Sequence, residues 1–274
     1  EHSVNYLESH DDNTLGDFIR LGTAEVRDTD RITDTYANAR LSPRQLAINK
    51  LAALYLLTCQ GPVMIAEGQE FARSKVIAPT SAPDPNVGRI DHNSYEKDNE
   101  TNFLNYHHQT LNKELYDYYR GLIALRKAFP AFSGARGVEF LRTEDDFLLA
   151  YTLGEGKRFL VILNGNPLHS GRVTLPKGNW GVLANAAAPV VLQNLPHSTP
   201  PGTPRLQPLP RRCRVPLVPE PLRQLLEVPP HLDRVDHLLA VRTHPLPAKT
   251  LDVRNRPRNR DDLRVDPRHA RSLS

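Results

Sequence analysis

Aromatic side chains are missing from the last third of this sequence: no phenylalanine, tyrosine or tryptophan follows Trp180. The same stretch holds 16 of the 24 prolines, from Pro189 onward, and 14 arginines against one lysine, Lys249. A stretch that is rich in proline and lacks aromatic rings cannot bury enough apolar surface to offset the entropy lost on ordering. We therefore expect residues 185–274 to form a proline- and arginine-rich tail that is disordered.

Other interpretations of this tail stay open. A proline-rich interaction segment and an arginine-rich nucleic-acid segment are the functional alternatives. Acids such as Asp261 and Asp262 dilute the basic charge, and no aromatic ring is present on which bases could stack. The abrupt change of composition in the middle of a series of expected strands is typical of translation in a shifted reading frame, which is a further hypothesis for this tail.

Cysteine is nearly absent, since only Cys59 and Cys213 are present. This pair predicts neither a disulfide framework nor a cysteine-based metal site, and no cofactor or metal is expected. No run of about 18 apolar residues occurs, so no membrane partner is expected. The sequence opens on Glu1 and not on a methionine or a signal peptide, so we expect the natural start to lie upstream, and the cellular location stays open.

The densest group of reactive side chains lies near the start of the chain. Residues 4–7, Val-Asn-Tyr-Leu, have the composition of a short buried strand, and Glu8, His10, Asp11 and Asp12 follow at its end. Charged groups at this density must be solvated or paired. A strand that ends in carboxylates and an imidazole is a common support for a functional site. The alternative is a solvated strand-to-loop transition with acidic capping residues.

The next segments predict a helix followed by a second strand. Ser42 is the expected N-cap, Pro43 takes the first helical position, and Gln45 closes a capping box. Residues 62–66, Pro-Val-Met-Ile-Ala, form a continuous apolar run that is typical of a parallel strand covered on both faces. Strand, helix and strand, with polar residues after each strand, indicate a β/α barrel.

The remaining elements are predicted with less regular signals. Residues 18–35 are expected to form a long loop with a short helix, and residues 72–110 are expected to be loop-like. Residues 112–127 are expected to form a second helix with Asn112 as its cap. Alternation with a period of two then predicts antiparallel strands at residues 138–141, 147–153, 158–163 and 172–175.

Three motifs carry a resemblance to a known family. Residues 4–17, VNYLESHDDNTLGD, resemble the last catalytic signature of the α-amylase superfamily in its pullulanase and debranching-enzyme branch. Residues 68–71, Gly-Gln-Glu-Phe, are similar to the eighth-strand signature of that superfamily. Residues 93–102 resemble a segment that borders the substrate cleft in the pullulanase-type members. The order of the motifs, with a helix between the first two, makes the resemblance more specific than any one motif.

The resemblance implies an α/β fold in three parts. Residues 1–130 would be the C-terminal portion of a catalytic (β/α)8 TIM barrel, residues 131–184 a partial antiparallel β-sheet domain, and residues 185–274 the disordered or frame-shifted tail. The implied function is that of a fragment of a retaining glycoside hydrolase that acts on α-glucans such as starch, glycogen and pullulan, with α-1,6 debranching. The alternatives are an isoamylase-like or α-amylase-like member, a noncatalytic glucan-binding fragment, and an arginine- and proline-rich interaction protein.

The resemblance also implies the site residues. Asp11 would be the catalytic carboxylate that stabilises the transition state, and the substrate-binding residues would be His10, Asn93, Tyr95, Asp98 and Asn102. Asp12 stands where the family more usually has asparagine. Retaining hydrolysis also needs a nucleophile and a general acid, about 5–5.5 Å apart. In the family these belong to earlier strands, and the motif at residues 88–92 only mimics the nucleophile's neighbourhood.

The chain alone is therefore expected to be inactive. Glu8 and Glu70 are expected to serve as supporting partners or caps and not as the missing carboxylates. The expected partner is an α-glucan, with no nucleic acid and no membrane.

Overall fold

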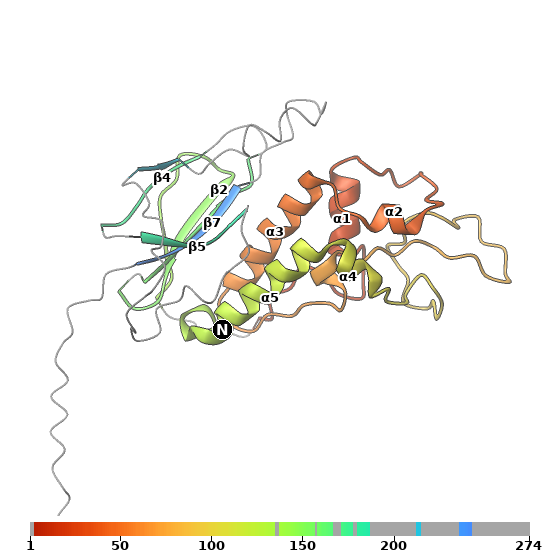
Figure 1. Ribbon diagram of the computed structural model, residues 1–274, viewed down its shortest axis with the longest axis horizontal. Coiled ribbons are helices and arrows are strands. Elements are labelled where there is room, and N and C mark those ends of the chain that lie inside the picture. Colours follow the sequence, from red (N-terminus) through yellow and green to blue (C-terminus); the bar gives the residue numbers. More distant parts are fainter. Residues whose placement is uncertain are drawn as a thin grey trace, which may run out of the picture. The chain divides into compact units, whose positions relative to one another are not determined.

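The computed structural model describes residues 3–134, 137–156, 158–166, 171–177, 180–186, 212–214 and 236–242, which all lie in one unit, Glu1–Thr243. The helices are α1 (Leu15–Gly22), α2 (Thr35–Ala39), α3 (Pro43–Thr58), the 3-10 turn η1 (Gln69–Phe71), α4 (His107–Leu111), α5 (Lys113–Ala128) and the 3-10 turn η2 (Pro130–Phe132). The strands are β1 (Glu139–Phe140), β2 (Leu148–Leu153), β3 (Phe159–Asn164), β4 (Arg172–Thr174), β5 (Trp180–Asn185), β6 (Arg212–Arg214) and β7 (Asp236–Arg242) (Figure 1).

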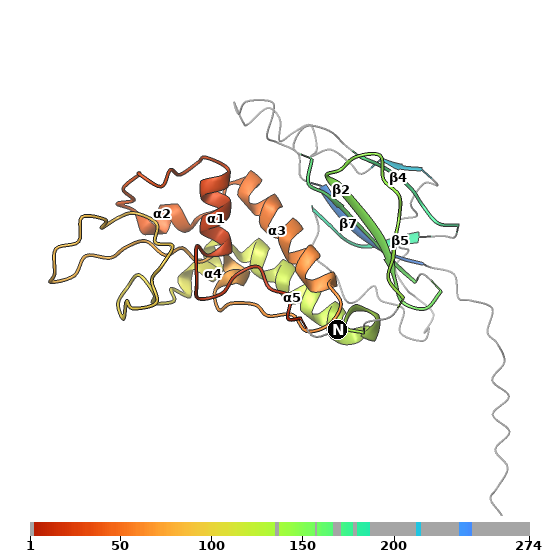
Figure 2. The ribbon, with the colours of Figure 1, turned by 180° about the vertical axis from the view of Figure 1, so that it is seen from behind.

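Helix α3 begins as its capping residues predict. The Ser42 hydroxyl accepts a hydrogen bond from the Gln45 main-chain nitrogen at 3.2 Å, and the Gln45 side chain accepts one from the Ser42 nitrogen at 3.0 Å. Two of the main-chain donors at the helix start are thereby satisfied. The helix lies beside α5 in both views (Figures 1 and 2), and Leu54 and Leu57 are buried between them and the sheet.

Helix α5 confirms the second predicted helix, but the role expected for Asn112 is wrong. Its side chain makes no capping bond to α5. The amide instead donates to the carbonyl oxygens of Ala39 and Phe71, at 2.8 and 2.9 Å, and accepts from the Leu41 nitrogen at 3.1 Å. Buried main-chain groups need hydrogen-bond partners within the protein. Asn112 supplies them here and so connects the end of α2 with η1.

The two predicted barrel strands meet at one residue pair. Asn5 and Val63 form a parallel bridge, in which the Asn5 nitrogen donates to the Pro62 carbonyl at 3.0 Å and the Met64 nitrogen donates to the Asn5 carbonyl at 2.9 Å. The expectation that residues 4–7 are buried is wrong, because Val4 and Tyr6 are 53% and 54% exposed. The second segment is covered on one face only: Val63 and Ile65 pack against the core, whereas Met64 is 39% exposed. No described strand flanks the pair, so apolar side chains that suit a barrel interior face solvent.

The polar stretch after residue 14 contains a short helix, as expected, and α2 follows at its end. Helix α1 begins at Leu15, where the Thr14 hydroxyl accepts a hydrogen bond from the Asp17 nitrogen at 3.0 Å. The Glu8 carboxylate accepts a second one from the Leu15 nitrogen at 2.9 Å. Glu8 therefore acts as a cap, as expected, and the helix starts immediately after the His10–Asp12 loop.

The second part of the chain is a five-stranded antiparallel sheet with the order β1-β2-β3-β7-β5. β1 to β4 confirm the predicted strands to within a few residues, although β4 pairs with β6 in a separate two-stranded sheet. β6 and β7 fall within the tail that was expected to have no strands, so that expectation is wrong at residues 212–214 and 236–242. The rest of the tail lies outside the described residues, except residues 185 and 186, and its predicted disorder stays a prediction.

One apolar cluster joins the helices to the sheet. Leu54 and Leu57 of α3 and Leu122 of α5 pack in the same cluster as Leu153 and Phe159 of the sheet. The Thr58 and Tyr151 hydroxyls, 2.6 Å apart, add a polar contact between α3 and β2. None of the helices in the part of the chain that the structure describes is long and apolar enough to cross a membrane.

Candidate active site

The predicted histidine and aspartate lie on an exposed loop between the Asn5–Val63 bridge and α1. His10 Nε2 is 3.3 Å from Asp11 Oδ1, and the two side chains are 79% and 69% exposed. Asp12 follows with a φ of 58°, in the left-handed region that aspartate and asparagine tolerate better than most residues. The loop thus turns sharply after Asp11 and leaves both predicted side chains open to a ligand.

A buried lysine supports this loop from beneath. Lys75 is 3% exposed, and its ammonium group donates to the His10 carbonyl oxygen at 3.3 Å. Burial lowers the pKa of Lys75 and the nearby Arg73 lowers it further, while Glu8, Asp91 and Asp17 act in the opposite direction. The carboxylates therefore favour the charged form that holds the His10 carbonyl.

Glu8 is the most perturbed carboxylate near the loop. Its side chain is 3% exposed, and burial raises its pKa to about 7 from 4.5, against the effects of the Leu15 nitrogen, Arg73 and Lys75. A carboxyl group that titrates near neutrality is a feature of functional sites as well as of buried structural groups. Because Glu8 caps α1 and points into the protein, the geometry makes it a support of the loop.

The Thr-Leu-Gly-Asp end of the first motif forms a buried clamp. Asp17 is fully buried, and its carboxylate accepts three hydrogen bonds. The donors are the Arg20 guanidinium at 3.2 Å, the Ser74 hydroxyl at 2.5 Å and the Lys75 main-chain nitrogen at 2.7 Å. Arg20 also donates to the Ala39 and Ala72 carbonyl oxygens. Asp17 therefore fixes the segment that carries Lys75 against α1.

The third motif forms a loop whose predicted binding residues divide into two groups. Asn93, Tyr95 and Asp98 are exposed, and the Tyr95 hydroxyl donates to Glu96 at 2.8 Å. The Asn102 side chain is instead engaged within the loop: it donates to the Ser94 and Lys97 carbonyl oxygens and accepts from the Ser94 hydroxyl. The structure thus places three of these side chains where a ligand can reach them and the fourth where it shapes the loop.

This loop is tied to the same support as the His10–Asp11 loop. The Asp91 nitrogen donates to the Lys75 carbonyl at 2.8 Å, and the Asp91 carboxylate lies 2.6 Å from the Lys97 ammonium group. Asp91 is 6% exposed, so the aspartate of the motif that mimics a nucleophile is used in the structure of the loop. Lys75 therefore contacts the His10–Asp11 loop and, through Asp91, the segment that leads into the third motif.

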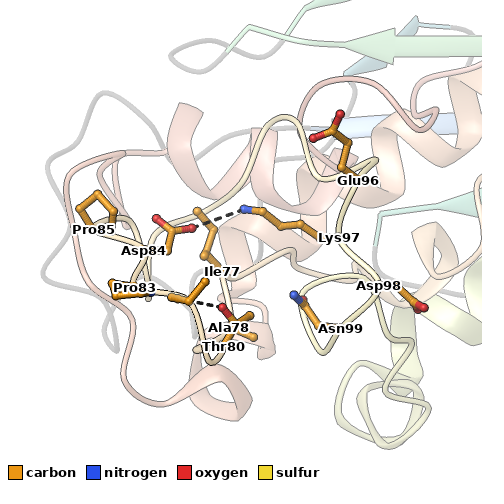
Figure 3. Close-up of a pocket in the computed structure, with 11 residues that line it drawn as sticks. Ile77, Ala78, Thr80, Pro83, Asp84, Pro85, Glu96, Lys97, Asp98 and Asn99 are labelled. Carbon is orange, nitrogen blue, oxygen red and sulfur yellow. Dashed lines mark hydrogen bonds and ion pairs between the residues drawn. The ribbon is translucent and has the colours of Figure 1, made fainter.

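A pocket of about 400 Å³ is lined by residues 77–85 and by residues 96–99 of the third motif (Figure 3). Ile77, Ala78 and Pro83 supply apolar surface to it, and Asp84 and Lys97 point toward each other across it, with a carboxylate–ammonium distance of 3.9 Å. Asp98 is the predicted binding residue that lines it. Within the described part of the chain, no group of three or more histidine, cysteine or acidic side chains could hold a metal ion.

Sequence reasoning missed one pair of exposed side chains close to the second motif. The Tyr106 hydroxyl donates to a Glu67 carboxylate oxygen at 2.6 Å, and Tyr106 remains 57% exposed. Glu67 directly follows the apolar run at residues 62–66, so its position at a strand end was visible in the sequence. Tyr106 lies 39 residues later, and no spacing rule connects it with Glu67.

Comparisons with known proteins give consistent results. No sequence-family model matches the chain. A pullulanase of Bacillus subtilis (strain 168) is 30% identical over 176 residues, which cover 60% of this chain and 21% of that protein. A glycogen debranching enzyme of Pectobacterium carotovorum is 28% identical over 211 residues, 66% of this chain and 30% of that enzyme. The chain thus spans less than a third of the length of these relatives.

The fold is similar to part of a solved pullulanase structure. A crystal structure of pullulanase from Anoxybacillus sp. LM18-11, complexed with maltotetraose, matches 88% of this chain and 28% of its own, with a TM-score of 0.55 and 18% identity. The chain is thus similar in sequence to part of a pullulanase and part of a glycogen debranching enzyme, and similar in fold to part of a pullulanase. These similarities support the resemblance to a fragment of a pullulanase-type glycoside hydrolase that the motifs predicted.

Proposed function

We propose that this chain supplies the His10–Asp11 pair of an α-glucan debranching site that acts on α-1,6 linkages. Asp11 holds ring hydroxyls of the sugar at the cleavage point and stabilises the oxocarbenium-like transition state, and His10 donates a hydrogen bond to the same sugar. The nucleophile and the general acid come from barrel strands that this chain does not contain. The chain alone therefore binds α-glucans without hydrolysing them.

The observation that carries this proposal is the parallel bridge between Asn5 and Val63. The C-terminal ends of parallel strands lie at the same edge. The His10–Asp11 loop and the Glu67–Glu70 segment therefore both begin on the same side of the Asn5–Val63 bridge. That edge is where β/α barrels carry their active sites. The proposed domain division follows: residues 1–130 belong to the barrel, residues 131–184 to the β-sheet domain, and residues 185–274 to the tail.

The exposed side chains of the third motif complete the proposed site. Tyr95 offers a ring face for a sugar, Asn93 and Asp98 offer hydrogen-bonding groups, and Asn102 contributes by holding the loop. Solved relatives are complexed with maltose and maltotetraose, which supports an oligosaccharide as the partner. The proposed partner is therefore an α-glucan, and neither nucleic acid nor a membrane is part of the proposal.

Affinity electrophoresis of the purified chain tests the proposal. Glycogen in the gel is expected to retard the chain and RNA is not, and the double variant His10→Ala/Asp11→Ala is expected to lose most of the retardation. Both side chains are exposed, so the double variant should fold like the wild type. Retardation by RNA alone would favour an arginine-rich interaction protein. If glycogen retards the wild type and the double variant equally, the result would favour a noncatalytic glucan-binding surface.

A further inference from the structure

Tyr106 is anchored by two contacts and is nevertheless largely exposed to solvent. Its ring packs at 60° against Phe71, with the centroids 6.1 Å apart, and Phe71 is only 1% exposed. Its hydroxyl is fixed by the bond to Glu67 at 2.6 Å. A large aromatic side chain that is anchored at both its ring and its hydroxyl, yet 57% exposed, has little rotational freedom left to lose on binding a ligand.

The backbone also fixes the two segments together. Gly68 has a φ of +93°, and a Cβ atom there would lie 2.8 Å from Arg73 Cδ and 3.0 Å from Leu104 Cδ2. The turn after Glu67 therefore packs directly on the segment that leads to Tyr106, and only glycine fits it without strain. Arg73 adds a hydrogen bond to the Asn102 carbonyl at 3.1 Å.

The charges around the ring decide what kind of ligand fits. Glu67 is exposed and Glu70 is half-buried, with one oxygen accepting from the Gly68 nitrogen at 3.1 Å. The hydrogen bond to Glu67 and the two carboxylates raise the pKa of Tyr106, so its hydroxyl stays a donor. An apolar partner would remove these carboxylates from water and leave each with one hydrogen bond in place of its full hydration, and a phosphate backbone would be repelled. A sugar fits both features, because it has an apolar C–H face and hydroxyl donors around its edge.

We propose that Tyr106 is a stacking platform for one glucosyl ring of the bound α-glucan, with Glu67 accepting hydrogen bonds from hydroxyls of that ring. This subsite rests on the proposed function. Glu67 lies four residues after Val63 and His10 lies five residues after Asn5, so the parallel bridge places both at the same edge. The platform therefore binds a different glucosyl unit of the α-glucan from the one that Asp11 holds.

Calorimetric titration of the full chain with maltotetraose tests the platform. Tyr106→Leu keeps an apolar cover on Phe71 but removes the aromatic face, and it is expected to weaken binding by about fivefold or more. Tyr106→Phe keeps the face and is expected to bind within about twofold of the wild type. The matched control is Tyr55→Leu, which replaces another exposed tyrosine, 43% exposed on α3, and is expected to change nothing. Circular dichroism of each variant verifies that it is folded.

The outcomes separate the platform from the function on which it rests. If the wild type binds maltotetraose and Tyr106→Leu binds it with the same affinity, the platform is overturned and the proposed function still stands. An equal loss in Tyr106→Phe and Tyr106→Leu would overturn the stacking role, because the ring would then contribute nothing. A wild-type chain that does not bind maltotetraose would overturn the proposed function and the platform together.

Discussion

The ammonium nitrogen of Lys75 lies 3.3 Å from the main-chain carbonyl oxygen of His10, directly beneath a loop whose side chains face the solvent. The main-chain carbonyl of the same lysine accepts a hydrogen bond from the Asp91 nitrogen, two residues before the third motif. One buried residue thus links the loop that carries Asp11 with the loop that carries Tyr95. The exposed groups of the proposed site are positioned by charged groups that no ligand touches.

Lys75→Met is expected to lower the free energy of unfolding by about 2 kcal/mol, because the carboxylates around it lose a buried partner. Urea denaturation measures the effect. Lys113→Met is the control, since the Lys113 side chain is 67% exposed in its ion pair with Asp117, and it is expected to cost less than about 0.5 kcal/mol. Equal stability of the two variants would show that Lys75 holds nothing in place.

Glu8 makes stability depend on pH. Its folded pKa of about 7 lies above the ordinary value of 4.5, so its contribution to stability is fully present below pH 4.5 and is lost as the pH rises through 7. The loss corresponds to about 3 kcal/mol. Glu8→Gln can still accept from the Leu15 nitrogen but does not ionise. Its stability relative to wild type is therefore expected to rise between pH 4.5 and pH 8, as measured by urea midpoints, and parallel pH curves would refute the burial argument.

The backbone angle of Asp12 predicts which residues the turn after Asp11 tolerates. Asparagine is expected to keep the free energy of unfolding within about 0.5 kcal/mol of wild type, whereas valine is expected to cost about 1–2 kcal/mol, because a β-branched residue fits the left-handed region poorly. Asp28→Val, at an exposed aspartate without a positive φ, is the control for the change of side chain. If Asp12→Val proves as stable as Asp12→Asn, the turn is not strained.

Local signals predicted the parts of the fold that local interactions decide. Ser42, Pro43 and Gln45 specify the start of α3 within four residues, and the structure has that capping box. The predicted cap Asn112 is instead used by Ala39 and Phe71, which lie far from it in the sequence. Long-range partners of this kind leave no trace in residue spacing.

The candidate site shows the same division. His10 and Asp11 could be found because the residues that define them are adjacent, whereas Lys75 and Tyr106 depend on contacts across 65 and 39 residues. The expected burial of residues 4–7 is wrong for a related reason. An apolar strand pattern indicates a core position only where neighbouring elements are present to cover it.

Hydrogen exchange tests the strand within the predicted tail. β7 pairs with β3 on one side and with β5 on the other, so amides in its centre, such as that of Leu239, are expected to exchange slowly. The amides of β6, whose described partner is β4 alone, are expected to exchange sooner and serve as the internal comparison. Exchange of the β7 amides at the rate of an unstructured peptide would instead support disorder throughout residues 185–274.

The central claim is that this chain holds the sugar at the cleavage point through Asp11 but carries no nucleophile and general acid to cut it. Release of reducing sugar from pullulan, starch and glycogen by the purified chain tests this most directly, with Asp11→Ala measured in parallel. The account predicts release no greater than that of buffer for both proteins. Release by the wild-type chain that Asp11→Ala abolishes would contradict it.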